Sequence, residues 1–137
     1  MALTKKLADF DNALDRLNEA YTQSQSRAGD DLFSFFRDSA IQRFEFTLEI
    51  AWKSIKTFLL EHEGIECRSP KGCLRDFLNA GYLDQLQITQ LLTMIDDRNL
   101  ATHTYHESLA EEIFGRIDTY RTVLGNILNT LQENSRS

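Results

Sequence analysis

The sequence has few residues that interrupt helices. One proline and six glycines occur among its 137 residues, which disfavours a turn-rich β fold and favours long helices. The two cysteines, Cys67 and Cys73, have no CxxC or HExxH motif beside them. Two cysteines are too few for the disulfide framework of a small secreted protein, and their spacing does not fit a zinc site. We therefore expect reduced thiols and no bound metal.

Long apolar runs and excess positive charge are absent as well. No run of about 18 apolar residues occurs, and the N-terminus lacks the apolar segment of a signal peptide. These absences predict a cytoplasmic protein without a membrane span. The 15 Lys and Arg against 21 Asp and Glu give a net charge of −6, which argues against general DNA binding and against a polybasic membrane binder. Any contact with nucleic acid must be local.

Several motifs of nucleotide and hydrolase chemistry are also missing. The chain has no P-loop, no GxGxxG, no G-x-S-x-G and no Gly-Ser pair followed by paired aspartates for metal ions. We expect no cofactor. With 42% hydrophobic and 26% charged residues, the composition is that of an ordinary folded protein. Its length predicts one domain that spans residues 1–137.

Apolar spacing predicts a first helix, a loop and a second, unusually long helix. The first helix has a stripe with alternating spacings of four and three, formed by Leu3, Leu7, Phe10, Leu14, Leu17 and Tyr21. Residues 21–29 lose this pattern and are interpreted as a loop. Asp30 or Asp31 is then expected to cap a helix over about 32–63. Gly64 would end that helix in a left-handed conformation.

The long helix is apolar on two sides. Phe46 and Ile50 lie nearly opposite its broad apolar face. That face contains Phe33, Ala40, Ile41, Phe44, Leu48, Ala51, Trp52, Ile55, Phe58 and Leu59. Since one bundle face cannot cover both sides, the helix is either central or also contacts a second subunit. We expect a homodimer.

Two further helices are predicted before residue 101. Ser69 can cap a short third helix in which Pro70 takes the first position, where its missing N–H does no harm. Gly81 would end it. The segment 84–87, Asp-Gln-Leu-Gln, resembles a capping box that opens a fourth helix, expected to end near Leu100.

The last helix has an uncertain start and a clear core stripe. Two overlapping capping boxes, Thr104 with Glu107 and Ser108 with Glu111, leave its first turn open. Its expected core positions are Ile113, Ile117, Tyr120, Leu124, Ile127 and Leu131. Residues 134–137 are expected to be a frayed tail. Together the helices predict an all-α fold, an up-and-down antiparallel four-helix bundle with an additional short helix.

A charged residue interrupts the apolar stripe of the fourth helix. Arg98 follows Ile95 by three residues and Leu91 by seven, so it points to the apolar side and needs an anion. The anion is either Glu45 or Glu49 of the long helix, in an ion pair within the chain, or a bound phosphate. The two glutamates could also hold a divalent ion, but no third acidic residue has a suitable spacing.

His103 is the second candidate for chemistry. It follows Arg98 by five residues, about 140° around a continuous helix, so the two share a site only if the helix breaks between them. The threonine-rich segment after Leu100 favours such a break. A phosphate held by both side chains would suit metal-free RNA cleavage, with imidazole moving a proton and guanidinium stabilising charge on phosphorus. The alternative is a loop histidine near a helix end.

Two stretches resemble a known family. Residues 98–105, Arg-Asn-Leu-Ala-Thr-His-Thr-Tyr, resemble the R-x4-H-x-Y motif of HEPN domains of the HepT-like kind. Residues 41–53, Ile-Gln-Arg-Phe-Glu-Phe-Thr-Leu-Glu-Ile-Ala-Trp-Lys, together with Ser-Pro-Lys at 69–71, resemble the nucleotidyltransferase substrate-binding proteins. The similarity covers nearly the whole chain in order. It implies a small, usually dimeric helical subunit that acts with a separate minimal nucleotidyltransferase protein.

The resemblance implies two functions. One is a substrate-binding or regulated subunit that completes the small transferase. The other belongs to a toxin–antitoxin pair, in which the HEPN protein is a metal-independent RNase with a cleft across its dimer and is silenced when the transferase adds AMP to the motif tyrosine. By position, Arg98 and His103 would be catalytic, Asn99 would support them and Tyr105 would accept AMP. His106 receives no role.

These functions remain alternatives at the level of sequence. The leading hypothesis is the regulated subunit, because the acidic composition suits a protein partner better than free RNA. The RNase using Arg98 and His103 is the rival, so whether the chain is an enzyme stays open. Glu45 and Glu49 are expected to support Arg98. Without the paired aspartates of a nucleotidyltransferase, the chain is not expected to transfer nucleotides alone.

Overall fold

The fold is built from helices that pack side by side. A computed structural model describes residues 2–103 and 106–136. Its elements are α1 (Ala2–Ser26), α2 (Phe33–Phe58), the π-helical turn η1 (Leu59–Glu63), α3 (Pro70–Asn79), α4 (Gln85–His103) and α5 (Glu107–Asn134). No strand occurs in these two ranges, and the predicted all-α class is confirmed. None of the described helices has the length and apolarity that crossing a membrane requires.

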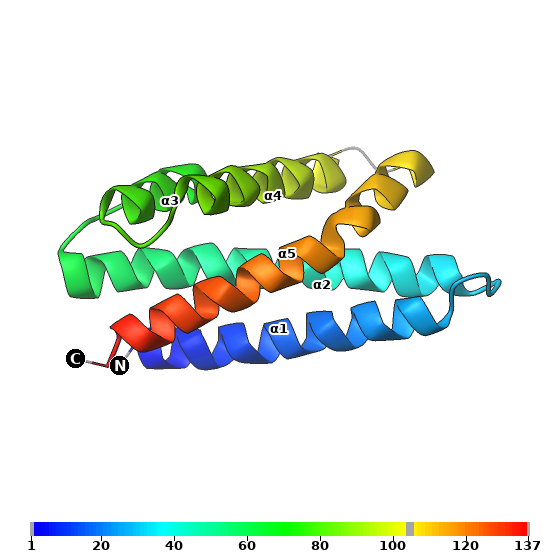
Figure 1. The fold of residues 1–137 in the computed structure, drawn as a ribbon, viewed down its shortest axis with the longest axis horizontal. Helices are drawn as coiled ribbons and strands as arrows, with labels where there is room; N and C mark the ends of the chain where they lie inside the picture. Colours follow the sequence, from blue (N-terminus) through cyan, green and yellow to red (C-terminus); the bar gives the residue numbers. More distant parts are fainter. Residues whose placement is uncertain (1, 104–105, 137) are drawn as a thin grey trace.

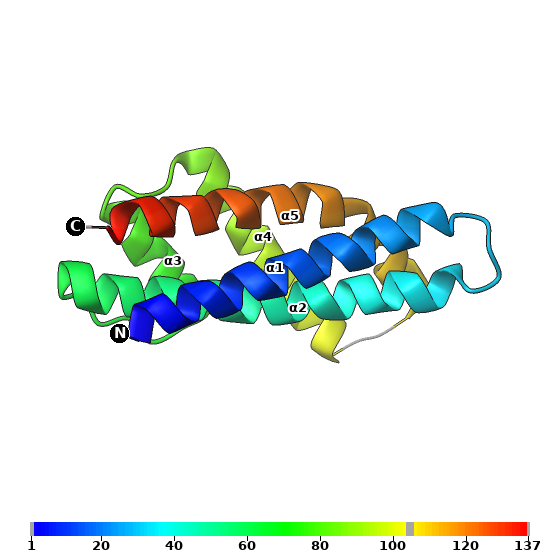
Figure 2. The same cartoon turned by 90° about the horizontal axis from the view of Figure 1, so that it is seen from below.

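The four long helices alternate in direction. α1 and α2 run antiparallel, α3 and α4 follow one another along the other side of α2, and α5 crosses the bundle diagonally (Figure 1). Seen from below, α1 lies between α2 and α5, and both chain ends lie at the same end of the bundle (Figure 2). This is the predicted up-and-down arrangement, in which α3 is the additional short helix.

The core follows the predicted apolar stripes. All six predicted core positions of α5 are buried, as are the inward residues of α1 from Leu3 to Leu17. The largest fully buried side chains include Phe10, Phe44, Phe58 and Phe77. Phe44 of α2 stacks on Tyr120 of α5, with ring centroids 5.2 Å apart. The centre of the bundle is therefore a continuous apolar layer, beside which the polar site is built.

Three predicted local signals have the expected geometry. The Ser69 Oγ accepts a hydrogen bond from the Gly72 N–H at 3.0 Å, which caps α3. Asp84 and Gln87 form a reciprocal box, because each side chain accepts from the other residue's backbone N–H, at 2.7 and 3.0 Å. Gly64 ends the π-helical turn with φ of 66°, a left-handed conformation that glycine adopts without strain.

Two boundaries differ from prediction. α1 continues through Ser26, so the predicted start of the loop at residue 21 is wrong, and the loop begins at residue 27. Its serine hydroxyls donate back to carbonyls of their own helix, Ser24 to Ala20 at 2.8 Å, and so remain compatible with helix. Asp30 accepts from the Leu32 N–H but does not cap α2, whose cap position is Leu32.

The expectation of reduced thiols is also wrong. Cys67 and Cys73 form a disulfide that joins the segment after η1 to the first turn of α3. Both cysteines are buried. The turn made by Ser69 and Pro70 brings their sulfur atoms together, which no cysteine motif in the sequence indicates.

Candidate functional site

Arg98 points from α4 to α2. Its Nη1 donates to Oε2 of Glu49 at 2.7 Å, and the same oxygen accepts from the Trp52 Nε1 at 3.0 Å. The Lys53 Nζ lies 3.1 Å from the other Glu49 oxygen. Of the two alternatives for the anion, the ion pair within the chain is therefore present, and its partner is Glu49. The Arg98 side chain is 23% exposed, so solvent reaches one side of it. Its Nε is buried and has no hydrogen-bond partner within the described residues.

The two glutamates of α2 have different roles. Burial raises the pKa of Glu49, but hydrogen bonds from Trp52, Lys53 and Arg98 outweigh it, and the net pKa is lowered. For Glu45, burial prevails over the attraction of Arg98, and the pKa is raised. The carboxylate that neutralises Arg98 is therefore that of Glu49. Among the described residues no three potential metal ligands lie together.

Replacing Glu45 with glutamine is expected to stabilise the protein at neutral pH by roughly 0.5 kcal/mol or less. A raised pKa means that the folded protein disfavours the charged form of the Glu45 carboxyl. The protonated carboxyl therefore stabilises the fold fully below pH 4.5, its ordinary pKa, and this stabilisation is lost as the pH rises through the raised pKa. Glutamine remains neutral, so its advantage should vanish near pH 4. Urea unfolding at both pH values measures this. A destabilised Glu45→Gln at pH 7 would mean that the attraction of Arg98 dominates.

α4 does not break between Arg98 and His103. The predicted end near Leu100 is wrong, because the helix continues through His103. The Thr102 Oγ1 donates back to the Arg98 carbonyl at 3.0 Å, so this threonine is accommodated within the helix. His103 therefore lies about 140° around the helix from Arg98. Within one protomer, the two predicted catalytic side chains are not brought together.

His103 instead shares a surface hollow with Asn99. Together with Asp96 and Leu100, they line a space of about 410 Å³. His103 and Asn99 are both exposed. Lys71 of α3 borders this surface and holds Asp96 at 2.6 Å. The candidate site residues therefore form two half-sites on α4. One is Arg98, which faces α2 and is neutralised by Glu49; the other is the exposed pair of His103 and Asn99 on another side of the helix.

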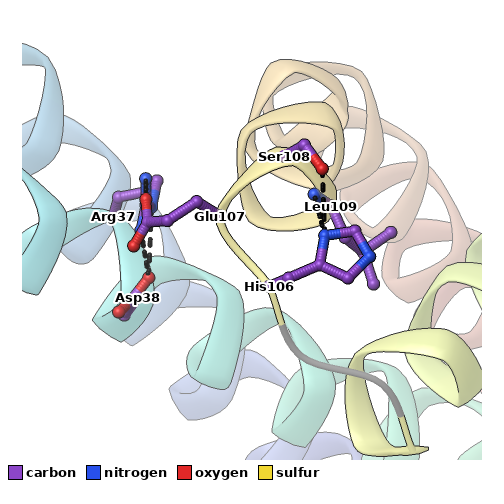
Figure 3. A network of polar contacts seen from close by, with 6 residues as sticks. All are labelled: Arg37, Asp38, His106, Glu107, Ser108 and Leu109. Carbon is purple, nitrogen blue, oxygen red and sulfur yellow. Dashed lines mark hydrogen bonds and ion pairs between the residues drawn. The ribbon is translucent and has the colours of Figure 1, made fainter.

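The first turn of α5 follows the motif directly. Thr104 and Tyr105, predicted as a helix cap and as the modified residue, lie outside the described residues. The next residue, His106, caps α5: its Nδ1 accepts from the Leu109 N–H at 3.3 Å and lies 2.9 Å from the Ser108 Oγ (Figure 3). Ser108, the other predicted cap, lies inside the helix. His106, for which the sequence suggested no role, thus has a structural one.

A buried arginine ties this turn to α2. Arg37 is 3% exposed, and its Nη1 donates to the Glu107 Oε2 at 2.9 Å while its Nε donates to Asp38 at 3.1 Å (Figure 3). The hydrogen bond and charge of Arg37 lower the pKa of Glu107. Arg37 was not predicted as a site residue, although it precedes Ile41 by four residues on the apolar face of α2, the same type of signal that Arg98 gives.

A second missed residue is Asp97. Its carboxylate accepts from the Arg116 Nε and Nη2 at 2.8 and 2.9 Å and from the Tyr120 hydroxyl at 2.5 Å. The hydrogen bond that Arg116 donates to Asp97 raises the pKa of Arg116. Burial first, and then the hydrogen bond to the Asp97 carboxylate, raise the pKa of Tyr120. A signal was available: Tyr120 is on the core stripe of α5, and Arg116 precedes it by one turn.

The comparisons with known proteins agree with this architecture. The model of a family described as nucleotidyltransferase substrate binding protein like matches residues 5–133. The chain belongs to this family. A crystal structure of a protein from Thermus thermophilus is 39% identical, covers 84% of this chain and 98% of its own, and superposes with a TM-score of 0.70.

Two further relatives have descriptive names. The probable ribonuclease HepT of Haemophilus influenzae is 27% identical over 101 residues, which are 71% of this chain and 68% of the relative. A Shewanella oneidensis HEPN toxin, solved tri-AMPylated and in complex with its MNT antitoxin, shares the fold with a TM-score of 0.77. At 17% identity, over 96% of each chain, that likeness establishes the fold alone.

Proposed function

We propose that the protein is the HEPN-type subunit of a two-component, toxin–antitoxin-like system whose other component is a minimal nucleotidyltransferase. The observation that carries this proposal is the family match over residues 5–133, which contains the R-x4-H-x-Y motif at 98–105. The Shewanella HEPN toxin is described in complex with an MNT antitoxin, and this chain shares its fold. The partner would bind the motif end of the bundle.

The half-sites favour a homodimer. Because Arg98 and His103 diverge in one protomer, a cleft lined by both types of side chain requires a second copy. Apolar side chains are exposed at this end, with Phe35 70% and Leu100 49% exposed. Phe35 and Ala101 line a hollow of about 450 Å³ with Glu45. Their burial against a second protomer would favour association and place the Arg98 of one copy near the His103 of the other.

The second candidate activity, metal-independent RNA cleavage, has its own support. The Haemophilus relative is named a probable ribonuclease. Here Arg98 has a buried Nε without a partner within the described residues, and His103 is exposed. A phosphate could compete with Glu49 for the guanidinium, while His103 transfers a proton to or from the RNA oxygens. Asn99 beside it would hold the substrate by hydrogen bonds.

Modification of Tyr105 tests the two-component proposal. Its phenol oxygen would attack the α-phosphorus of ATP, forming an O–P bond, releasing pyrophosphate and losing its proton. After incubation with ATP and a minimal nucleotidyltransferase that co-purifies with it, the protein should gain the mass of at least one AMP, with the first on Tyr105, as measured by intact and peptide mass spectrometry. Tyr105→Phe should abolish that first addition, and the control Tyr82→Phe should not. An unmodified Tyr105 in the wild-type protein would refute the regulatory link.

A further inference from the structure

The motif half of α4 has almost no apolar anchor. The structure describes every residue of this helix, and the buried ones are Ile88, Leu91, Met94, Ile95 and Asp97. After Ile95, the one fully buried side chain of the helix is therefore a carboxylate, since Leu100 is exposed and the small Ala101 is only partly buried against the core. Apolar packing holds the first three turns of α4 against the bundle, but it does not determine the rotation of the last two turns, which contain Arg98, Asn99 and His103.

Asp97 provides a directional anchor where apolar packing ends. The Arg116 Nε and Nη2 each donate to one oxygen of the Asp97 carboxylate, and the Tyr120 hydroxyl donates a third hydrogen bond to that carboxylate. The Tyr120 ring stacks on Phe44 in the core. A paired carboxylate and guanidinium restrict orientation more than an apolar contact does, because two parallel hydrogen bonds must keep their geometry.

The direction of Asp97 determines that of its neighbours. Successive residues of a helix are rotated by about 100°, so a carboxylate held toward α5 leaves Arg98 facing α2 and turns Asn99 and His103 away. We propose that the Asp97, Arg116 and Tyr120 cluster is a positioning device that fixes the rotation of the motif half of α4 and thereby holds Arg98 against Glu49. Its bearing on activity rests on the proposed function, but its structural effect does not.

Stability alone does not account for such a cluster. A buried ion pair is often no more stabilising than apolar residues of similar volume, because removing two charges from water opposes their attraction. An apolar residue at 97 could extend the stripe of Ile95 while allowing the helix to rotate. The ion pair selects one rotation, and that rotation brings Arg98 within 2.7 Å of Glu49.

The chain contains its own reporter of this contact. Trp52 is its one tryptophan, and its Nε1 donates to the Glu49 oxygen that also accepts from Arg98. The indole N–H gives a single NMR resonance whose position depends on that shared oxygen. Displacing Arg98 should therefore shift the Trp52 resonance, and Arg98→Ala defines the position that corresponds to a lost contact.

The decisive variant is Asp97→Asn. Asparagine keeps the size and one acceptor but loses the charge and the paired geometry, while Arg116, 40% exposed, can turn to solvent. The control is Ile127→Val, a substitution at a buried position elsewhere on α5. The Asp97→Asn and Ile127→Val proteins are each measured at the same number of degrees below their own melting temperature. We expect Asp97→Asn to move the indole resonance toward the Arg98→Ala position and Ile127→Val to leave it at the wild-type position. Tyr120→Phe, which removes one hydroxyl, should give a smaller shift in the same direction.

Three results would overturn the proposal. The first is a wild-type indole position in Asp97→Asn when Arg98→Ala moves it. The second is an equal shift in Ile127→Val, which would indicate general loosening. The third is an unmoved resonance in Arg98→Ala, which would remove the Trp52 link on which the proposal depends. If Asp97→Asn does not fold, Tyr120→Phe is tested instead, and a Trp52 indole resonance left at the wild-type position in that variant overturns the proposal. None of these measurements uses RNA or the nucleotidyltransferase, so they leave the proposed function to its own tests.

Discussion

Replacing His103 with alanine is expected to lower metal-independent RNA cleavage by about 10²- to 10⁴-fold, the usual contribution of a positioned general acid or base. The imidazole is exposed on α4 beside Asn99, where a substrate oxygen can reach it. The measurement is cleavage of RNA by purified protein in EDTA, which excludes divalent metal ions. Arg98→Ala should lower cleavage by about 10²- to 10³-fold, because the stabilisation of charge on phosphorus is lost.

His62→Ala is the matched control for this experiment. His62 is also exposed but lies in η1, where it stacks on Phe58 with ring centroids 4.8 Å apart. Its replacement should leave cleavage unchanged. Cleavage that survives in His103→Ala, or that stops in EDTA, would contradict the proposed chemistry. Intact RNA at high protein concentration would count against an RNase and leave the regulated subunit.

A purely structural adaptor predicts a different result for the arginine. In that case Arg98→Ala would unfold the protein rather than only disable it. The side chain is partly exposed and its ion pair lies at the edge of the core, so we expect a folded variant. Circular dichroism and urea unfolding of Arg98→Ala separate the two cases before any activity is measured.

Phe44→Ala is expected to lower the free energy of unfolding by about 3–5 kcal/mol. Phe44 is fully buried at the centre of α2 and stacks on Tyr120. Its removal takes a large apolar side chain from the core and leaves a cavity that the surrounding helices cannot fill. Because a domain of this size has a total stability of only about 5–15 kcal/mol, the variant should be marginal at 37 °C. Urea unfolding followed by circular dichroism measures the loss.

Phe46→Ala provides the comparison two residues further along α2. Phe46 is 52% exposed, so its replacement should change the unfolding free energy of the protomer by no more than about 0.5 kcal/mol. If its apolar side contacts a second copy, as the two-sided pattern of α2 predicts, the same variant should weaken the dimer in analytical ultracentrifugation. Equal destabilisation by Phe44→Ala and Phe46→Ala would contradict the described core.

The relation between Arg98 and Glu49 affects how an anion would bind. The guanidinium is already neutralised by a carboxylate of its own chain at 2.7 Å, so a phosphate must displace that carboxylate or use the remaining donors. The Glu49 carboxyl also has Trp52 and Lys53 as partners, which can hold it when Arg98 turns to a ligand. Glu49 would thus keep the arginine oriented while the site is empty.

The sequence by itself determined the helices, the caps of α3 and α4, and the family. Apolar stripes and capping boxes depend on residues within about one turn of each other, so Ser69, Asp84 with Gln87, and Gly64 were predictable. The choice of Glu49 rather than Glu45, the anchor at Asp97 and the disulfide of Cys67 with Cys73 depended on tertiary packing. These contacts join segments whose approach is set by how whole helices pack and turn, which no local pattern specifies. The divergence of Arg98 and His103 is partly local: their spacing places them about 140° apart on a continuous helix, and the structure shows that α4 does continue past Leu100.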